Sequence, residues 1–341
     1  MQLISIIIPV YNDKSNLKRC LDSALNQKYP DTEIIIVSDG APPDIYEILN
    51  DYSERYTSII KLISRPHLGV LQARLTGLEA ASGEYVIFLD SDDYINRIYL
   101  YELMYVKRYS DCDIVLAKTN YVKNELVTSA SRVYPREFRI SEDKKTLLSI
   151  DSSVNGKLFQ KDSLKLPDYR LQANEALPYL YYYLVSVDKI SFSNFSKYYV
   201  SSGKNTVSKN YLDGNLLFID NVIRPLEIMY NLYKGEKLLS KYQEEVEAIF
   251  IKNIFLEIDR VKRVVKDREK QPQLINVLIK YLNYHFPKWR ENKYLKRGFV
   301  DFNSDIFVKL NMVALGTRRI KTTGNLDSNE ATRGFKRILK N

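Results

Sequence analysis

Hydrophobic and polar positions in the first third of the chain alternate between two patterns. A continuous apolar run at residues 3–10 is typical of a strand buried on both faces of a parallel sheet. Shorter segments that are rich in apolar residues recur at 33–37, 59–63, 85–89 and 113–117. Between the runs, apolar side chains recur at helical spacing near 15–25, 44–52, 69–82 and 98–109. Strands that alternate with helices in this way predict a parallel α/β sheet.

The rest of the chain follows a different pattern, irregular after residue 120 and helical beyond about residue 210. Strands are expected within 151–160 and 189–200, and helices over 175–185, 242–265 and 272–286. We therefore expect an α/β domain over residues 1–208. A mainly helical domain is expected over residues 209–341.

Charge separates these two parts. Residues 1–200 contain 24 basic and 26 acidic side chains, whereas the remainder contains 27 and 16. A basic surface usually meets an anion, although a solvated basic helical surface explains the same count. Nucleic acid is not an expected partner, because no recognition motif of that class is present.

The bulk composition disfavours membrane-spanning and disulfide-rich classes. No apolar run approaches the ~18 residues of a membrane span. The N-terminus has neither the basic region nor the cleavage site of a secretory signal. The two cysteines, Cys20 and Cys112, form no metal or disulfide pattern. Together these features predict a cytoplasmic protein.

Acidic side chains follow three of the predicted strands at the point where each strand ends. The first strand leads into Asp13, the second ends at Asp39, and the fourth ends at Asp90–Asp93. The carboxyl ends of parallel strands meet at one edge of a sheet, so we expect these carboxylates to converge. Their repulsion favours a compensating cation. Mg²⁺ or Mn²⁺ suits such a site, because it takes one or two carboxylates plus phosphate oxygens.

Each acidic segment also has a simpler explanation. Asp39-Gly40 is compatible with an ordinary turn that contains an Asx-type hydrogen bond. Asp90–Asp93 is compatible with a solvated helix N-terminus, where Asp is favoured. Their joint placement at neighbouring strand ends favours a ligand site.

Several segments occur in a fixed order over roughly the first 200 residues. They are Ser5–Asn12, Glu33–Gly40, His67–Val70 with Arg74, Ala80–Tyr85, Phe88–Asp93 and Asn155–Phe159. In this order they resemble the family-two glycosyltransferases, whose catalytic domain has the GT-A fold. The layout is similar to that of enzymes that glycosylate teichoic acids and capsules in Gram-positive bacteria.

The resemblance implies a nucleotide site at the ends of the first two strands. Pro9, Tyr11 and Asp39 would hold the uridine, with Tyr11 packed on the base and Asp39 accepting the base N–H. Asp13 would lie near the nucleotide edge. Arg74 would reach the diphosphate or the base.

The acidic cluster would then hold the sugar and the metal. The resemblance implies that Asp90 and Ser91 contact the ribose and the sugar, and that Asp92 ligates Mn²⁺ or Mg²⁺. Asp93 would either contact the donor sugar or cap the segment that follows.

The loop before the third predicted helix also resembles the corresponding segment of the family. His67 stands where the family usually has Asn, and Gly69 follows in the same loop. Both are expected at the donor site. For His67, a contact with phosphate or base and a hydrogen bond within the loop are equally good explanations.

The catalytic base is expected at the start of the helix near residue 175. The family has a Glu-Asp pair there, and its Asp deprotonates the acceptor hydroxyl. The corresponding pair in this chain is Asn174-Glu175, so the resemblance implies Glu175 as the base. A Glu favoured by the helix dipole is the alternative. Ser38 and Leu75 also depart from the family pattern, which bears on donor preference.

The resemblance implies that the chain is a metal-dependent, inverting glycosyltransferase. It would move a sugar from a UDP-sugar to a hydroxyl of a cell-surface glycan, polymer or glycoconjugate. The basic second part would meet an anionic polymer acceptor, the anionic inner face of the cell membrane, or a second copy of the chain. The alternative is a degenerate transferase-like module that binds a nucleotide sugar or a partner enzyme without turnover.

Overall fold

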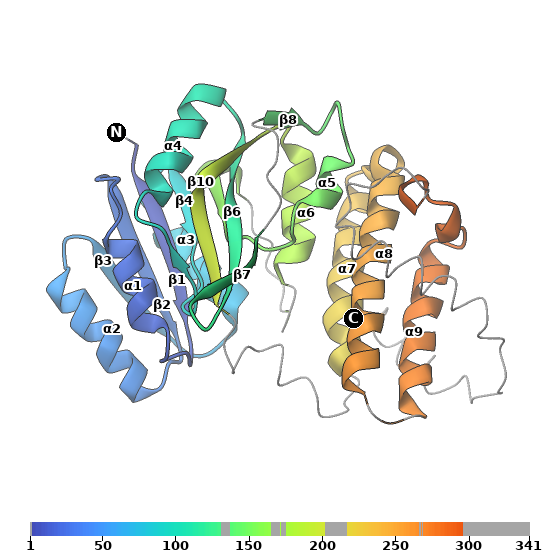
Figure 1. Ribbon diagram of the computed structural model, residues 1–341, viewed down its shortest axis with the longest axis horizontal. Helices are drawn as coiled ribbons and strands as arrows, with labels where there is room; N and C mark the ends of the chain where they lie inside the picture. Colours follow the sequence, from blue (N-terminus) through green and yellow to red (C-terminus); the bar gives the residue numbers. More distant parts are fainter. Residues whose placement is uncertain are drawn as a thin grey trace. The chain divides into compact units, whose positions relative to one another are not determined.

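The computed structural model divides into two compact units (Figure 1). It describes residues 2–130, 137–164, 171, 175–201, 217–265, 267 and 269–295. The first unit comprises residues 1–143 and 152–210, and the second comprises 144–151 and 211–341. The predicted domain boundary between residues 208 and 209 lies outside the described residues and stays a prediction.

A mixed sheet of ten strands forms the first unit, in the order β3-β2-β1-β4-β9-β6-β10-β5, with β7 beside β6 and β8 beside β10. Its strands are β1 (Ile4–Val10), β2 (Thr32–Asp39), β3 (Ile60–Arg65), β4 (Tyr85–Phe88), β5 (Tyr94–Ile95), β6 (Ile114–Lys123), β7 (Leu126–Ala130), β8 (Glu137–Arg139), β9 (Lys157–Gln160) and β10 (Lys189–Ser201). The fold is therefore of the α/β class, as predicted.

Helices cover both faces of this sheet. They are α1 (Leu17–Leu25), α2 (Pro43–Arg55), α3 (Val70–Ala80), α4 (Tyr99–Ser110) and α6 (Ala176–Ser186), with a short 3-10 turn η1 (Lys161–Ser163). Buried side chains of α1, α2 and α4 pack with Ile6 and Ile8 of β1 in one hydrophobic core. Ile7 points to the opposite face, where α3 approaches so closely that a Cβ at Gly77 would lie 2.4 Å from the Ile7 side chain.

The strand directions confirm the predicted parallel series. The strands β1, β2, β3 and β4 are mutually parallel, as the alternation of strands and helices predicts. The sheet as a whole is mixed, because β9, whose direction the sequence left open, runs antiparallel to both β4 and β6. Residues 152–156 bring the chain to the carboxyl edge of the sheet, where Asn155 bonds Asp90, so β9 must run back from that edge.

The second unit is helical. It contains α5 (Thr146–Ser149), α7 (Leu217–Gly235), α8 (Leu239–Val264), α9 (Lys270–His285), η3 (Trp289–Glu291) and η4 (Lys293–Leu295). The central helix α8 packs with α7 and α9, and Phe250 of α8 stacks on Tyr281 of α9 with ring centroids 5.9 Å apart. Among the described residues, no helix combines the length and the apolar character needed to cross a membrane.

Candidate active site

The end of β2 fixes the loop that leads into α3. Gly40 adopts a φ of +70°, and a Cβ there would lie 2.9 Å from the His67 Cβ, so glycine is required. The Asp39 carboxylate is 2% exposed and accepts hydrogen bonds from the amides of Leu68 (3.0 Å) and Gly69 (2.8 Å). His67 Nδ1 lies 2.9 Å from the same carboxylate. Asp39 thus positions the loop, and Gly69 contributes through its backbone amide.

An aromatic pair lies at the end of β1. The Tyr11 ring is 43% exposed and stacks on the His67 ring, with centroids 4.0 Å apart and planes 19° apart. Pro9 is buried within β1. Sequence reasoning treated Tyr11 and His67 separately, because nothing in their spacing shows that the two rings meet. A flat ligand such as a nucleobase is suited to such an exposed aromatic surface.

Asp90 is held from two sides. Arg74 Nη2 donates to Asp90 Oδ1 at 2.7 Å, and Asn155 Nδ2 donates to Asp90 Oδ2 at 2.6 Å. Asn155 is itself fixed by Lys157, a lysine only 2% exposed whose Nζ donates to the Asn155 carbonyl at 3.3 Å. Asn155 was not among the predicted site residues. Its place in the matched segment Asn155–Phe159 was the signal that could have found it.

Asp93 is bound to β10. Tyr198 donates from its hydroxyl to Asp93 Oδ2 at 2.8 Å, and the Ser201 amide donates to Asp93 Oδ1 at 2.9 Å. Asp93 is only 4% exposed, and burial, followed by repulsion from Asp90 and Asp92, raises its pKa. These hydrogen bonds hold Asp93 against β10, and the two roles expected for Asp93 stay predictions.

Asp92 differs from Asp90 and Asp93 in its exposure and in its hydrogen bonds. Its carboxylate is partly exposed, as is Ser91, and among the described residues no other residue hydrogen-bonds to it. Burial, followed by repulsion from Asp90 and Asp13, raises the pKa of Asp92 to about 6. A carboxylate that is destabilised by its neighbours and free of partners is a suitable oxygen ligand for a hard cation.

The surroundings of Asp92 supply few further ligands. Asp13 is engaged in a local turn, where it accepts hydrogen bonds from the Ser15 amide (3.0 Å) and the Ser15 hydroxyl (2.9 Å). Within the described ranges, no group of three or more His, Cys, Asp or Glu side chains is arranged to hold a metal ion. The donor set therefore fits a divalent cation that shares one or two carboxylates with a diphosphate.

Arg74 connects the acidic loop, which comprises Asp90–Asp93, to Glu175. Its guanidinium is 4% exposed and forms ion pairs with both Asp90 and Glu175. Burial by itself lowers the pKa of Arg74, but the two carboxylates outweigh it and the pKa is raised, so the cation persists. Glu175 immediately precedes α6 and is partly buried. The family resemblance implied that Arg74 reaches the diphosphate or the nucleobase; in the structure its guanidinium pairs with Asp90 and with Glu175, the predicted catalytic base.

Removing this buried cation should destabilise the first unit. Arg74→Met leaves Asp90 and Glu175 partly buried without their shared counter-charge, and we expect a loss of about 3 kcal/mol in the free energy of unfolding. Urea denaturation measures the loss. Arg55→Met is the matched control, since its pair with Asp51 is exposed and should contribute less than about 1 kcal/mol. Equal effects in the two variants would contradict the assigned role of Arg74.

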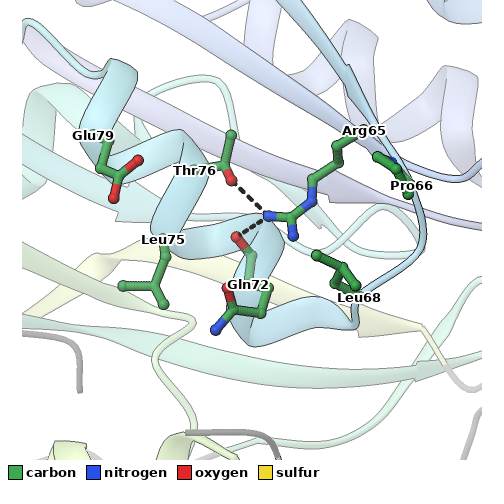
Figure 2. Close-up of a pocket in the computed structure, with 7 residues that line it drawn as sticks. All are labelled: Arg65, Pro66, Leu68, Gln72, Leu75, Thr76 and Glu79. Carbon is green, nitrogen blue, oxygen red and sulfur yellow. Dashed lines mark hydrogen bonds between the residues drawn. The ribbon is translucent and has the colours of Figure 1, made fainter. Parts of the chain in front are cut away.

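A cavity of about 490 Å³ lies beside this region (Figure 2). It is lined by Arg65, Pro66, Leu68, Gln72, Leu75, Thr76 and Glu79. Figure 2 shows the Arg65 guanidinium donating to the Gln72 carbonyl and to the Thr76 hydroxyl, each at 2.6 Å. None of the predicted site residues lines this cavity. The wall of the cavity adjoins the candidate active site at Arg65, because Arg65 Nε lies 3.4 Å from the Asp39 carboxylate.

Comparison with solved structures supports the predicted fold. The chain is similar to a fragment of S. aureus TarS crystallised in complex with UDP-GlcNAc, with a TM-score of 0.67 and 19% sequence identity. The similarity covers 93% of this chain and 92% of the TarS fragment. The GT-A fold expected from the sequence is confirmed by this match.

Sequence comparison identifies the family. The profile described as Glycosyl transferase family 2 matches residues 5–165. An uncharacterized glycosyltransferase of Haemophilus influenzae is 31% identical over 222 residues, covering 62% of this chain and 83% of that protein. The uncharacterized glycosyltransferase EpsJ of Bacillus subtilis is 40% identical over 113 residues, which is 33% of each chain. The chain therefore spans only about a third of the length of EpsJ, but it matches most of the Haemophilus protein. From these matches and the geometry described above, the chain belongs to glycosyl transferase family 2.

Proposed function

We propose that the protein transfers a sugar from a UDP-sugar to a hydroxyl of a glycan, polymer or glycoconjugate, with inversion at the anomeric carbon. The observation that carries this proposal is the link made by Arg74. It holds the acidic loop and Glu175 on one buried cation, so the candidate metal ligand and the candidate base lie at the same edge of the sheet. The S. aureus TarS fragment, which shares the fold, was crystallised with UDP-GlcNAc, and this supports a UDP-sugar as donor.

The uridine would bind at the ends of β1 and β2. The exposed Tyr11 ring offers a stacking surface, and His67 lies against it. Asp39 keeps the loop of residues 67–69 in place and would accept the base N–H. This binding mode requires the base to share the Asp39 carboxylate with two backbone amides.

The diphosphate would lie beside the acidic loop. Asp92 would hold Mn²⁺ or Mg²⁺, and Asp13 lies near enough to raise the pKa of Asp92. When bound, the metal supplies positive charge that stabilises the leaving diphosphate. Arg74 remains with Asp90 and keeps the loop in the orientation that presents Asp92.

Glu175 would act on the acceptor. Its carboxylate takes the proton of an acceptor hydroxyl as the hydroxyl oxygen attacks the anomeric carbon from the face opposite UDP. The new bond joins that oxygen to the anomeric carbon, and the bond between the anomeric carbon and the diphosphate oxygen breaks. Inversion follows from a single displacement.

The experiment that tests the proposal is an assay of UDP release with a panel of UDP-sugars, Mn²⁺ and hydroxyl-bearing glycan acceptors. NMR of the product reports the anomeric configuration. We expect UDP release that depends on acceptor, with an inverted linkage. A retained configuration would reject the single displacement. Stabilisation by a UDP-sugar without any release of UDP would favour the degenerate binding module.

Metal binding should depend on pH through Asp92. Its pKa is raised to about 6 from an ordinary 3.8, so protons compete with the cation below pH 6. We expect the Mn²⁺ affinity to fall about tenfold per pH unit there and to change little above pH 7. Because the folded-state pKa is raised, Asp92 stabilises the metal-free fold fully below pH 3.8 and loses this contribution as the pH rises through about 6. Calorimetric Mn²⁺ titration at several pH values checks the first effect, and pH-independent affinity would contradict it.

The partner of the basic second part belongs to the same proposal. Residues 201–341 contain 27 basic and 16 acidic side chains. This positive charge fits an anionic acceptor polymer or an anionic membrane surface, and the helices could instead associate with a second copy through other contacts. Much of this charge lies in residues 296–341, outside the described residues. Flotation with anionic and neutral vesicles tests the membrane, and light scattering tests self-association. Equal binding to both vesicle types would remove the membrane from the proposal.

A further inference from the structure

The hydroxyl of Tyr198 bridges the two ends of the acidic loop. It accepts a hydrogen bond from the Asp90 amide at 3.2 Å and donates one to Asp93 Oδ2 at 2.8 Å. The Tyr198 ring is 1% exposed in β10 and packs edge to face on Tyr99, with ring centroids 6.5 Å apart. A single buried oxygen therefore joins the first and last residues of the loop.

Two further hydrogen bonds restrict the loop between these ends. The Asp93 amide donates to the Asp90 carbonyl at 3.0 Å, which closes a turn over Ser91 and Asp92. The Ser201 amide binds the second oxygen of Asp93 at 2.9 Å. With both ends held, the backbone of Asp92 has little freedom, and this fixes the direction of its Cα–Cβ bond and so the side to which its carboxylate extends.

We propose that Tyr198 is a positioning residue that holds Asp92 in the orientation that binds a divalent cation. The inference rests on the metal site of the proposed function and names a residue that the family resemblance did not. Residues that orient a metal ligand typically contribute about 10- to 100-fold to metal affinity when mutated. Ring packing does not need the hydroxyl, so Tyr198→Phe removes the bridge and keeps the buried ring.

The test compares Tyr198→Phe with the wild-type chain in two measurements. Electron paramagnetic resonance gives the Mn²⁺ dissociation constant, which we expect to rise about tenfold. Hydrogen exchange of metal-free protein reports the amides of residues 88–94, which we expect to exchange faster because the Asp90 amide loses its acceptor. The second measurement needs neither metal nor substrate.

Tyr52→Phe is the matched control. Its hydroxyl also donates to an aspartate, Asp22 Oδ1, at 2.8 Å, and its ring is 6% exposed. This control should leave both the Mn²⁺ affinity and the exchange of residues 88–94 unchanged. The inference is overturned if Tyr198→Phe binds Mn²⁺ within twofold of wild type, if the control weakens binding equally, or if the wild type binds no Mn²⁺. Wild-type Mn²⁺ binding without sugar transfer would reject the proposed activity alone.

Discussion

Glu175→Gln is expected to lower the turnover number for sugar transfer by about 1000-fold, the range typical of general-base catalysis. The amide keeps the size of the side chain, and its oxygen can still accept the hydrogen bond from Arg74. It cannot take a proton from the acceptor hydroxyl. Binding of UDP should stay within twofold of wild type, because the proposed nucleotide contacts are with Tyr11 and Asp39. Steady-state kinetics and calorimetric titration with UDP separate the two quantities.

Glu79→Gln provides the matched control for this variant. Glu79 lies on α3 at the wall of the neighbouring cavity, is exposed, and should tolerate the change without loss of turnover. Turnover above a tenth of wild type in Glu175→Gln would assign the base to another residue. A parallel loss of UDP binding would show that Glu175 acts through the structure of the site.

The second large effect is expected for Asp92→Asn, which should reduce transfer by at least about 100-fold and abolish measurable Mn²⁺ binding, since a neutral amide is a poor ligand for a hard cation. The metal-free variant should be at least as stable as wild type near pH 7. The substitution removes the charge that Asp90 and Asp13 repel. Activity assays over a range of Mn²⁺ concentrations and urea denaturation measure the two effects.

The control for Asp92→Asn is Asp44→Asn on α2. Asp44 forms an exposed pair with Lys14 at 2.7 Å, and its loss should change neither metal binding nor transfer. Transfer by Asp92→Asn at the wild-type rate, with unchanged Mn²⁺ dependence, would reject the assignment of Asp92 as the metal ligand. A clear loss of stability at pH 7 would contradict the repulsion argument.

Much of the sheet could be predicted because its strands carry an unmistakable local signal. Residues 3–10 and 34–37 are apolar apart from Ser5, and such runs are expected only where both faces of a strand are covered. The direction of β9 could not be predicted, because its four residues carry no directional signal. Its antiparallel course depends on where residues 152–156 meet the acidic loop, a contact between segments far apart in the chain.

The candidate site likewise has features that the sequence predicts and features that it does not. The proximity of Asp13 to Asp92 was predictable, because both follow predicted strands and the carboxyl ends of parallel strands meet at one edge. The partners of those residues were not. Nothing local indicates that Tyr11 stacks on His67 or that Tyr198 bridges the acidic loop.

The sequence by itself determined that this protein has an α/β unit with acidic strand ends and a basic helical part, because hydrophobic periodicity and charge are properties of short segments. Only the tertiary structure decided that Arg74 holds Glu175 beside Asp90, that Asp93 is bound to β10, and that Asp92 lacks a hydrogen-bond partner among the described residues. The physical reason is that pairing of side chains depends on how distant segments pack, and a buried ion pair forms only where packing excludes water from both partners.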